Sequence, residues 1–583
     1  MKTRITYLIL LALLLVLHFS IWGGYVVCNV LFCAVAALTI AVAWFQRVSF
    51  RIKTTSFIVA YTVWLLIVMV LSGRECHMDR GYFFCLCWLL FFPLQSVFVN
   101  QTVRKNVVWL FVVCVAFEMM VGFAQLFGLL GSGNSFFVLG GSFGNPALFA
   151  AYISLVMPFL LAEYLCVRKC SNNEIKRYVI LLCLIFMAYF LAISYSRGAW
   201  MSVLASSLYI IENNIHILEK IKKILSARRK IILASVTCTI LVAGMVVALY
   251  SIKKDSADGR LFIWKVSASQ NHQNVLLGNG IGTFEAKYGE WQRDYFANNG
   301  GTERERYLAD YVTCAYNEFL EAYVEQGVIG LLLLIMVLIA ALRFKPCGES
   351  SVFVPAKSAV IGFVILCFVS YPTHCEVLYL QFVVTLALLY SHQERKEKHN
   401  ILGSLVQPLL FVGIVFGGLV PLWQGFSRCN AGRQKVMRGD VEGALSLYES
   451  AYPQIYNNGT FLFYYGSALA ISGDIHKSIE VLEQAEQKSS DNHIPLLLGD
   501  GYKAAGDTVK ALAAYQRAID GIPSLLYPQY KKAKLYFEMG DRDNACRLAH
   551  KIISAKEKVS TTAAKEIKEE MRNMLNKEKI DLK

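Results

Sequence analysis

Long apolar runs alternate with short polar segments over residues 1–425, and the pattern becomes mixed after that point. Thirteen runs are predicted to cross a hydrocarbon core as helices, which takes about 20 residues each. They lie at 5–22, 25–45, 55–72, 82–99, 107–129, 146–166, 178–194, 198–211, 230–251, 314–342, 357–371, 375–391 and 402–423. The pattern predicts an all-α chain, in which a polytopic membrane bundle precedes a soluble helical region.

Composition agrees with the membrane assignment, because 56% of the 583 residues are hydrophobic and too few polar residues remain to cover a soluble domain. The net charge of +15 would suggest nucleic acid for a soluble protein. Here the basic residues cluster next to predicted spans, so we expect anionic phospholipid as the partner and no nucleic acid. Residues 217–225 form an amphipathic stretch, which predicts a helix lying in the membrane interface.

Basic residues occur mainly in alternate loops, and such loops stay on the cytoplasmic side. The rich set contains Lys2, Arg4, Arg47, Arg51, Lys53, Arg104, Lys105, Arg168, Lys169, Lys176, Arg177, the basic residues of 220–230, Arg343, Lys345, Lys357, Arg395, Lys396 and Lys398. The opposite short loops contain only Arg74, Arg80 and Arg197. We therefore expect a cytoplasmic N-terminus, with the polar interval 252–312 and everything after Trp423 outside.

The region after residue 425 contains a repeat. Gly-Asp recurs at 439–440, 473–474, 506–507 and 540–541, and a small residue precedes each pair by seven positions, namely Gly432, Gly466, Gly499 and Ala533. Small residues allow two helices of a hairpin to approach closely, and the pattern resembles tetratricopeptide repeats. We assign 426–560 to these repeats and 561–583 to a charged helical tail. Such arrays usually bind a protein or peptide, so we expect a recruitment or assembly role.

Four features of the predicted outer side could carry chemistry: the Gly-rich loop 139–146, the turn 195–198, the interval 252–312 and the loop 371–376. Arg197 and Arg260 lie in two of them, and guanidinium groups suit phosphate because they donate two parallel hydrogen bonds. These arginines suggest a pyrophosphate site, although Arg197 alone could also reach the interface. The glycines of 278–282 predict a tight turn, since no strand precedes them.

Carboxylates follow the interval 252–312. Glu321 and Glu325 are one turn apart on the helix predicted to start near Tyr316, so both can face one cleft. Glu325 fits a structural ion pair with an arginine as well as it fits catalysis, and His374 fits a solvated interfacial side chain. The sixteen cysteines include no CxxC pair, so the sequence predicts neither a metal site nor a cofactor.

The order of these motifs resembles the O-antigen ligase superfamily. It comprises Asn145 in Gly-Asn-Pro, Arg197 in Ser-Arg-Gly, Arg260 with Trp264, the Gly-x-Gly turn, and the segment 317–330 with Asn317, Glu318, Glu325 and Gly330. The superfamily includes lipopolysaccharide O-antigen ligases, O-antigen polymerases and protein O-oligosaccharyltransferases. The resemblance covers roughly residues 1–425, with its specific motifs in 140–330.

The resemblance implies a GT-C type membrane fold. It also implies metal-independent transfer of a glycan from a polyprenyl pyrophosphate, such as undecaprenyl pyrophosphate, to an acceptor hydroxyl on the outer, periplasmic side of a bacterial inner membrane. Arg197 and Arg260 match the arginines that would hold the pyrophosphate leaving group. Catalytic roles are expected for Tyr316, Glu321 and Arg260, with Asn145, Asn317, Glu318, Glu325 and His374 in support.

One position departs from the family, which commonly has His where this chain has Tyr316. A tyrosine, with an ordinary pKa of about 10, is a poor base at neutral pH. Tyr316 could hydrogen-bond a substrate without taking a proton, or Glu318, Glu321 or His374 could supply the base, or the chain could be inactive.

The acceptor separates the transferase hypotheses. We place an O-antigen or polysaccharide ligase of lipopolysaccharide biosynthesis first, with a glycolipid or protein acceptor, ahead of protein O-oligosaccharyltransferase and polymerase. A transporter has no need of so long an outer interval, and it would be favoured by inverted repeats. A non-catalytic scaffold that presents the repeats is the third hypothesis.

Overall fold

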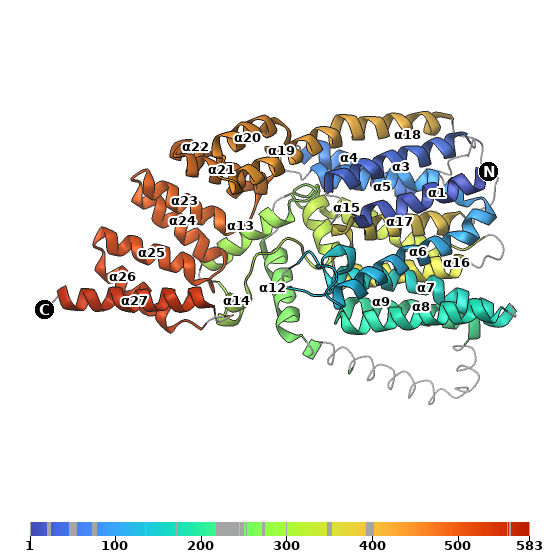
Figure 1. The fold of residues 1–583 in the computed structure, drawn as a ribbon, viewed down its shortest axis with the longest axis horizontal. Coiled ribbons are helices and arrows are strands. Elements are labelled where there is room, and N and C mark those ends of the chain that lie inside the picture. The colour runs from blue at the N-terminus through green and yellow to red at the C-terminus, as the bar shows by residue number, and fades with distance from the viewer. Residues whose placement is uncertain are drawn as a thin grey trace. The chain divides into compact units, whose positions relative to one another are not determined.

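A computed structural model describes most of the chain (Figure 1). The described residues are 2–19, 25–45, 55–72, 78–134, 136–170, 173–216, 253–270, 274–298, 300–346, 352–391, 401–556 and 561–581, with the single positions 244, 250, 251 and 558. All regular structure in these ranges is helical. The predicted amphipathic stretch 217–225 and most of the predicted span 230–251 lie outside them.

Helices of the chain form two compact units, and each is described by itself. The first, the membrane unit, comprises Met1–Leu71, Met78–Ile252 and Tyr316–Val420. Its helical elements are α1 (Lys2–Leu15), η1 (Val16–Phe19), α3 (Tyr25–Phe45), α4 (Ser56–Ser72), α5 (Met78–Phe98), α6 (Gln101–Leu126), η3 (Gly141–Phe143), α7 (Pro146–Cys170), α8 (Glu174–Ile193), α9 (Arg197–Ile215), α15 (Glu318–Arg343), α16 (Phe353–Val369), η4 (Pro372–His374), α17 (Glu376–Tyr390), α18 (Ile401–Ile414) and the π-helical turn η5 (Val415–Leu419).

Membrane-spanning character is clear for part of this bundle. Six helices in the described residues are long and apolar enough to cross a membrane: α5, α6, α7, α8, α15 and the continuous helix Val406–Met437. Shorter apolar helices lie at Arg4–Phe19, Val27–Ala43, Ser56–Ser72, Phe353–Val369 and Glu376–Tyr390. Each predicted span except 230–251 coincides with a helix, but the count of thirteen is not confirmed.

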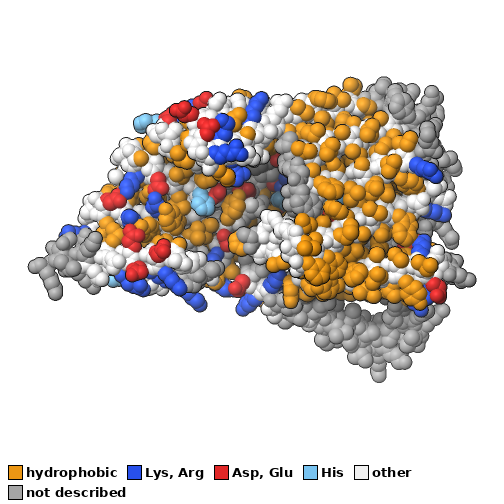
Figure 2. Space-filling view, in the orientation of Figure 1, with side chains coloured by type: hydrophobic (Ala, Val, Ile, Leu, Met, Phe, Trp, Pro, Cys, Tyr) orange, Lys and Arg blue, Asp and Glu red, His pale blue; other side chains and the backbone are white. Residues whose placement is uncertain are grey.

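Apolar side chains cover the surface of the membrane unit as well as filling its interior. Figure 2 shows hydrophobic side chains over nearly all of its visible described face. Leu8, Val70, Met120, Leu182 and Phe416 are exposed examples from five different helices. A surface of this kind suits lipid rather than water, so the chain is a membrane protein.

The interior of the membrane unit is built around α5 and α17, which are buried along almost their whole length. Trp88 of α5 donates a hydrogen bond to the Tyr379 hydroxyl of α17 at 2.7 Å, which satisfies a buried indole N–H. On the other side, the ring of Phe382 stacks on Phe363 of α16 with centroids 3.9 Å apart. Helices α7, α9 and α16 pack against one another beside this core.

The second unit, the repeat unit, comprises Ser72–His77, Lys253–Ala315 and Pro421–Lys583. Its first helices are α12 (Lys254–Gln270), α13 (Phe284–Ala297) and α14 (Glu303–Leu308). The others are α19 (Val420–Met437), α20 (Val441–Ile455), α21 (Gly459–Ser472), α22 (Ile475–Lys488), α23 (His493–Ala504), α24 (Thr508–Gly521), α25 (Leu526–Met539), α26 (Arg542–Ser554) and α27 (Thr562–Asp581). The domain boundaries 1–425, 426–560 and 561–583 stay predictions, and by packing the residues 253–315 lie with the C-terminal helices.

Each Gly-Asp pair ends one helix and starts the next. Gly439, Gly473, Gly506 and Gly540 have φ between 75° and 90°, a backbone region that glycine adopts at little cost. The following aspartates cap α20, α22, α24 and α26, because each side chain accepts a hydrogen bond from a backbone N–H three residues later. The repeated dipeptide is therefore a combined helix stop and start.

The small residues face a larger side chain in the partner helix. A Cβ on Gly432 would lie 2.6 Å from the Tyr448 ring, and one on Gly499 would lie 2.3 Å from the Tyr515 ring. Gly466 faces Leu482 in the same way. In the last hairpin Ala533 and Ala549 are both fully buried in one cluster, which Met571 and Leu575 of α27 complete. The hairpins therefore pack as tetratricopeptide-like pairs.

Candidate functional site

The start of α15 is set by two residues of the motif Tyr-Asn-Glu. Tyr316 has φ of 52°, so the chain turns sharply before the helix. Asn317 then accepts hydrogen bonds from the N–H groups of Phe319 and Leu320, both at 3.0 Å, and caps the helix. It also donates to the Phe368 carbonyl at 3.3 Å. The motif thus places three glutamates on the first two turns of α15.

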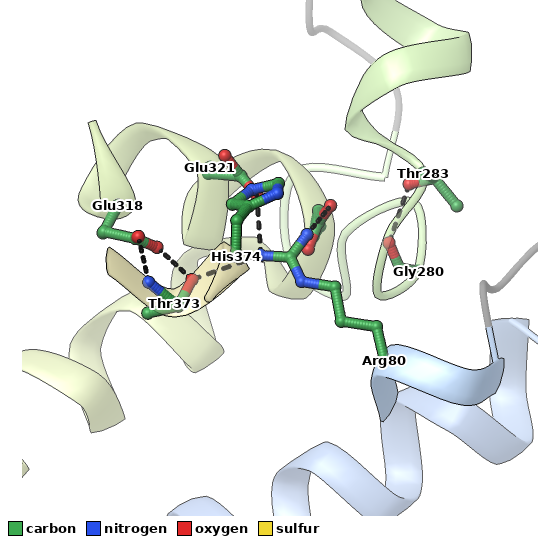
Figure 3. A network of polar contacts seen from close by, with 8 residues as sticks. Arg80, Gly280, Thr283, Glu318, Glu321, Thr373 and His374 are labelled. Carbon is green, nitrogen blue, oxygen red and sulfur yellow. Dashed lines mark hydrogen bonds and ion pairs between the residues drawn. The ribbon is translucent and has the colours of Figure 1, made fainter. Parts of the chain in front are cut away.

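Two of those glutamates form ion pairs with one arginine of α5, Arg80, which Figure 3 shows beside Glu321. Arg80 donates to Glu321 at 2.8 Å and to Glu325 at 3.3 Å, and its guanidinium lies 5.1 Å from the centre of the Phe84 ring. The carboxylate side chains are 1–2% exposed and the arginine is 17% exposed. A charge buried this far is stable only with a partner, so the ion pairs and the helix packing depend on each other.

The loop between α16 and α17 supplies the remaining polar groups (Figure 3). Thr373 donates its backbone N–H and its hydroxyl to the two oxygens of Glu318, at 2.8 and 2.5 Å, and accepts from Arg80 at 3.2 Å. His374 Nε2 lies 2.5 Å from the Glu321 oxygen that also accepts from Arg80. Glu321 therefore joins a cation on one side to an imidazole on the other.

A cavity of about 400 Å³ opens beside this cluster. Arg80, Thr373 and His374 line it, together with Ser142 and Phe143 of the Gly-rich loop and Asp79 and Glu376. The cavity is roughly the size that a small polar group or one sugar ring needs. The His374 imidazole lines the cavity. Glu321 does not line it but contacts two residues that do, His374 and Arg80.

The Gly-Asn-Pro motif leads to the same loop. Gly144 takes a left-handed conformation at φ 61°, and Asn145 then accepts a hydrogen bond from the Ala147 N–H at 2.8 Å at the start of α7. The Asn145 amide donates to the Tyr371 hydroxyl at 2.9 Å. The Tyr371 ring in turn packs edge-on against Tyr316, 5.2 Å away between centroids, and lies 6.0 Å from His374.

A second buried pair of side chains, His18 and Glu118, holds the Gly-rich loop in place. His18 Nδ1 and Glu118 Oε1 are 2.6 Å apart and both side chains are fully buried. Glu118 also accepts from the Ser142 N–H at 2.9 Å and from its hydroxyl. The Gln125 side-chain oxygen accepts hydrogen bonds from the backbone N–H groups of Gly140 and Gly141, at 3.0 and 2.9 Å. These contacts fix the loop that forms one wall of the cavity.

The glycines that follow Glu325 have a structural cause. Gly327 has φ of 69° and ψ of −175°, so it interrupts α15. The Gln326 carbonyl at this break accepts a hydrogen bond from the Trp64 indole at 3.1 Å. A Cβ on Gly330 would lie 2.9 Å from the same indole nitrogen. The spacing of Glu325, Gly327 and Gly330 is therefore needed to pack α4 against the bent helix.

The two predicted phosphate-binding arginines lie in different units. Arg197 is half-buried at the first turn of α9, next to Gly198, which packs on Val369. Arg260 is half-buried on α12 in the repeat unit, and Trp264 of the same helix donates to the Ala315 carbonyl at 2.8 Å. That the two converge on one pyrophosphate stays a prediction.

The turn at 278–282 agrees with the sequence interpretation. Gly278, Gly280 and Gly282 all have positive φ, between 78° and 110°, and α13 starts directly afterwards. Thr283 closes the turn with a hydrogen bond from its hydroxyl to the Gly280 carbonyl at 2.7 Å (Figure 3). The predicted tight turn is confirmed, and it leads directly into α13.

Seven of the nine predicted site residues belong to one connected set of contacts: Asn145, Tyr316, Asn317, Glu318, Glu321, Glu325 and His374. The sequence analysis did not select Arg80, which joins most of them, or Thr373. The only sign of Arg80 was that few basic residues occur in its set of loops. For Glu325, the alternative of an arginine partner is confirmed.

One carboxylate, Glu321, joins the charged groups of this site. Arg80 forms ion pairs with Glu321 and Glu325, His374 contacts Glu321, and Glu318 is held by Thr373. Because Glu321 contacts His374 Nε2 at 2.5 Å, its carboxylate can stabilise the positive charge that the imidazole gains when it takes up a proton. The site can therefore accept a proton from a hydroxyl that enters the cavity.

Comparison with known proteins gives one family match. Residues 182–335 match a family model described as O-antigen ligase. No curated protein is significantly similar to the chain. Among solved structures, one of MamA is 19% identical, with 26% of this chain and 81% of that chain covered and a TM-score of 0.22. An APC/C hetero-tetramer structure, Cut9-Hcn1, is 11% identical, with 95% and 91% covered and a TM-score of 0.23.

Likenesses at these TM-scores carry no argument, whereas the family match covers Arg197, Arg260 and the start of α15. It supports a membrane glycosyltransferase of the ligase or polymerase type, and with it the resemblance inferred from the sequence is confirmed over this region. Over residues 182–335 this chain is therefore similar to the O-antigen ligase family.

Proposed function

We propose that this protein transfers a glycan from a polyprenyl-pyrophosphate carrier to an acceptor hydroxyl on the outer face of a bacterial inner membrane. The observation that carries the proposal is the pair of Glu321 and His374, 2.5 Å apart beside a cavity, with Glu321 inside the region that matches the O-antigen ligase family. It supplies the proton acceptor that Tyr316 does not.

In the transfer step, the acceptor oxygen attacks the anomeric carbon of the glycan, and the bond from that carbon to the pyrophosphate oxygen breaks. His374 accepts the hydroxyl proton, and Glu321 stabilises the imidazolium that forms. The electron pair of the broken bond leaves with the carrier pyrophosphate. Arg197 and Arg260 bind that group and neutralise the charge that develops on it.

Arg80 has a different role from these two arginines. Its donors are directed at Glu321, Glu325 and Thr373. Arg80 therefore orients the proton-accepting pair of Glu321 and His374 and does not bind the leaving group. Tyr316 packs against Tyr371 and shapes the approach to His374. Glu318 and Asn145 act as positioning residues, because each holds one residue of the loop 371–376.

Among possible acceptors we place a glycolipid first, which makes the protein an O-antigen or polysaccharide ligase. This preference rests on the description of the matched family. Protein O-oligosaccharyltransferase and polymerase use the same donor chemistry and differ in the acceptor. The distribution of basic residues supports a periplasmic position for the site.

A deletion strain tests the proposal by comparison of lipopolysaccharide ladders, capsule and glycoprotein profiles with the parent strain. We expect one of the three to lose its glycan, and the profile that changes identifies the acceptor. Unchanged profiles in all three would contradict the transferase function.

The site assignment has its own test in the complemented strain. Arg260→Ala should abolish transfer, and Tyr316→Phe should retain most of it, because an edge-on ring contact does not need the hydroxyl. If Tyr316→Phe abolishes transfer while His374→Gln does not, the tyrosine and not the histidine handles the proton. If Arg260→Ala and His374→Gln are both fully active, the site lies elsewhere.

A further inference from the structure

Residues 253–315, here called the intervening segment, separate two parts of the membrane unit in sequence but fold with the C-terminal helices. Helix α13 packs against the repeat helices α22 and α24. Its buried side follows helical spacing through Phe284, Tyr288 and Trp291, and Phe296 is buried near its end. A helix with one such apolar side needs a surface to cover it, and the repeats contribute to that surface.

The fit between α13 and the repeats is close. A Cβ on Gly289 would lie 2.0 Å from the Ser490 Cβ, in the link between α22 and α23. Glycine in the middle of a helix costs about 1 kcal/mol relative to alanine, so its presence in α13 agrees with a need for this approach. The Gln292 amide donates to the Gly521 carbonyl at 2.7 Å, and Glu285 accepts from Ser489 at 2.8 Å.

Charged side chains extend the same contact around a cavity of about 620 Å³. Arg517 of α24 forms two parallel hydrogen bonds to Glu486 of α22, at 2.9 and 3.0 Å. Arg293 of α13 lies 3.8 Å from the same carboxylate. The intervening segment therefore joins an ion-pair network that the repeats have already formed.

A second tie lies further along the intervening segment. Lys558, between α26 and α27, donates to the Ala309 carbonyl at 2.7 Å and lies 3.6 Å from an Asp310 carboxylate oxygen. Gln292 also donates to the Asp310 carbonyl at 3.1 Å. The residues leading to Tyr316 are thus held by the repeats and by α13 together.

Arg260 is connected to these ties through α12. The Phe262 ring packs on Tyr295 and Phe296 of α13, at 5.8 and 5.7 Å between centroids. Lys265 donates to Glu305 of α14 at 2.7 Å and to the Tyr295 hydroxyl at 2.9 Å. A continuous set of contacts therefore runs from the repeat helices through α13 to the helix that carries Arg260.

We propose that the repeats serve as a clamp in the same chain, which docks α13 and so positions Arg260 for transfer. The docking stands on the contacts themselves, and its purpose rests on the proposed function. Gly289, Gln292 and Lys558 are then positioning residues, although none of them contacts a substrate. The partner of this face of the repeats is the intervening segment and not a separate protein.

Gly289→Ala tests the clamp in the full-length protein. Alanine favours the helical state of α13, so any loosening comes from the contact with Ser490 and not from loss of helix propensity. Ser490→Gly in the same chain should relieve the contact, and Gly259→Ala is the matched control, because a Cβ there meets nothing within 4 Å. Two readouts are needed: hydrogen exchange of residues 284–297 in detergent, and glycan transfer in the complemented strain.

With Gly289→Ala we expect exchange in 284–297 to rise by at least about tenfold and transfer to fall, and the double variant to restore both. Unchanged exchange would overturn the docking. Faster exchange with full transfer, while Arg260→Ala is inactive, would overturn the positioning role and leave the transferase function intact. Absence of transfer by the unaltered chain would overturn the proposed function and, with it, the purpose of the clamp. Hydrogen exchange of residues 284–297 would still show whether α13 docks on the repeats.

Discussion

Ion pairs in the two units differ in burial. At the start of α15, Glu321 and Glu325 are 1–2% exposed where they meet Arg80. In the repeats, the pair of Lys435 and Asp440 is 41% and 49% exposed, and most pairs of that unit resemble it. Exposed pairs contribute about 0–1 kcal/mol each, whereas burying a charge costs several kcal/mol before its partner offsets this.

The difference shows which region gains stability from charge. The repeats need none of their exposed pairs, because their hairpins are held by small residues against large ones and by aspartate caps. The cluster around Arg80 gives little net stability for its burial, and apolar residues of similar volume would serve the fold as well. A role in chemistry accounts for this burial of charge better than stability does, so the two regions should respond differently to loss of a charge.

Removal of Arg80 should give the largest effect. Arg80→Met leaves Glu321 and Glu325 buried without their cation, which should destabilise the membrane unit by about 3–5 kcal/mol and abolish transfer. The triple variant Arg80→Met, Glu321→Gln, Glu325→Gln should recover much of the stability but not the activity. Thermal unfolding in detergent and the transfer assay measure the two. Recovery of activity in the triple variant would show that the cluster is only structural.

Substitution of His374 should affect the reaction more than the fold. His374→Gln keeps a donor for Glu321 but cannot carry the proton, so transfer should fall by about 10²- to 10⁴-fold with unchanged unfolding temperature. The pH dependence of the residual activity should also flatten. Asn145→Ala, which acts through Tyr371, should give a smaller loss and keep the pH profile. A similar pH profile in His374→Gln and the parent would exclude the histidine as base.

Overpacking should have the largest effect in the repeats. Gly499→Ala places a Cβ 2.3 Å from the Tyr515 ring and should destabilise the repeat unit by about 1–3 kcal/mol. Gly501→Ala in the same helix is the control, because its closest neighbour is the flexible Ile479 side chain at 3.1 Å, and the gain in helix propensity offsets the contact. Hydrogen exchange of α23 and α24 in the full chain compares the two variants. Equal effects would contradict the close approach.

Loss of a cap should cost less. Asp507→Ala removes the acceptor for the Lys510 N–H at 3.0 Å and should cost about 1 kcal/mol. Lys503→Met removes an exposed pair with Glu538 and should cost less than about 0.5 kcal/mol. Hydrogen exchange of α24, compared with that of α23, separates the effect of the lost cap from that of the lost ion pair. A larger loss for Lys503→Met would reverse the assignment of stability to caps over exposed pairs.

The smallest effect is a pH dependence in the repeats. The hydrogen bond from His493 to Asp491 raises the pKa of His493 above its ordinary value. The pair therefore contributes stability that is fully present below the unfolded-state pKa and is lost as pH rises through the higher folded-state pKa. Unfolding of the repeat unit should thus be slightly easier at pH 8 than at pH 6. Asp491→Asn should remove this slope, and its persistence would assign the slope to another group.

The repeats could be predicted closely from the sequence because their determinants are local. A glycine that needs positive φ, an aspartate that caps the next helix and a small residue at fixed spacing all act within one hairpin. The larger residue that faces each small one, such as Tyr448 for Gly432, belongs to the same hairpin and is close in sequence. Helices of the membrane bundle were predictable for a similar reason, since hydrophobic length alone indicates them, but not which of them cross the membrane.

The site could be predicted only in part. The spacing of Glu321 and Glu325 placed both on one side of α15, whereas their shared partner Arg80 is 241 and 245 residues away in sequence. Sequence patterns cannot give such a pairing, because it depends on how α5 and α15 pack. The pair of His18 and Glu118 was not predicted for the same reason. Tyr316 drew attention as a missing base, but the loop containing His374 supplies the imidazole.

The docking of α13 onto the repeats has a consequence for biosynthesis. Gln292 and its hydrogen-bond partner Gly521 are 229 residues apart, so the helix leaves the ribosome well before its binding surface does. At about 5–20 residues per second, that delay is on the order of 10 to 45 s. During this interval the apolar side of α13 lacks its final cover. Completion of the segment that carries Arg260 therefore has to wait for α24, and a chain truncated before α24 would leave that segment without its cover.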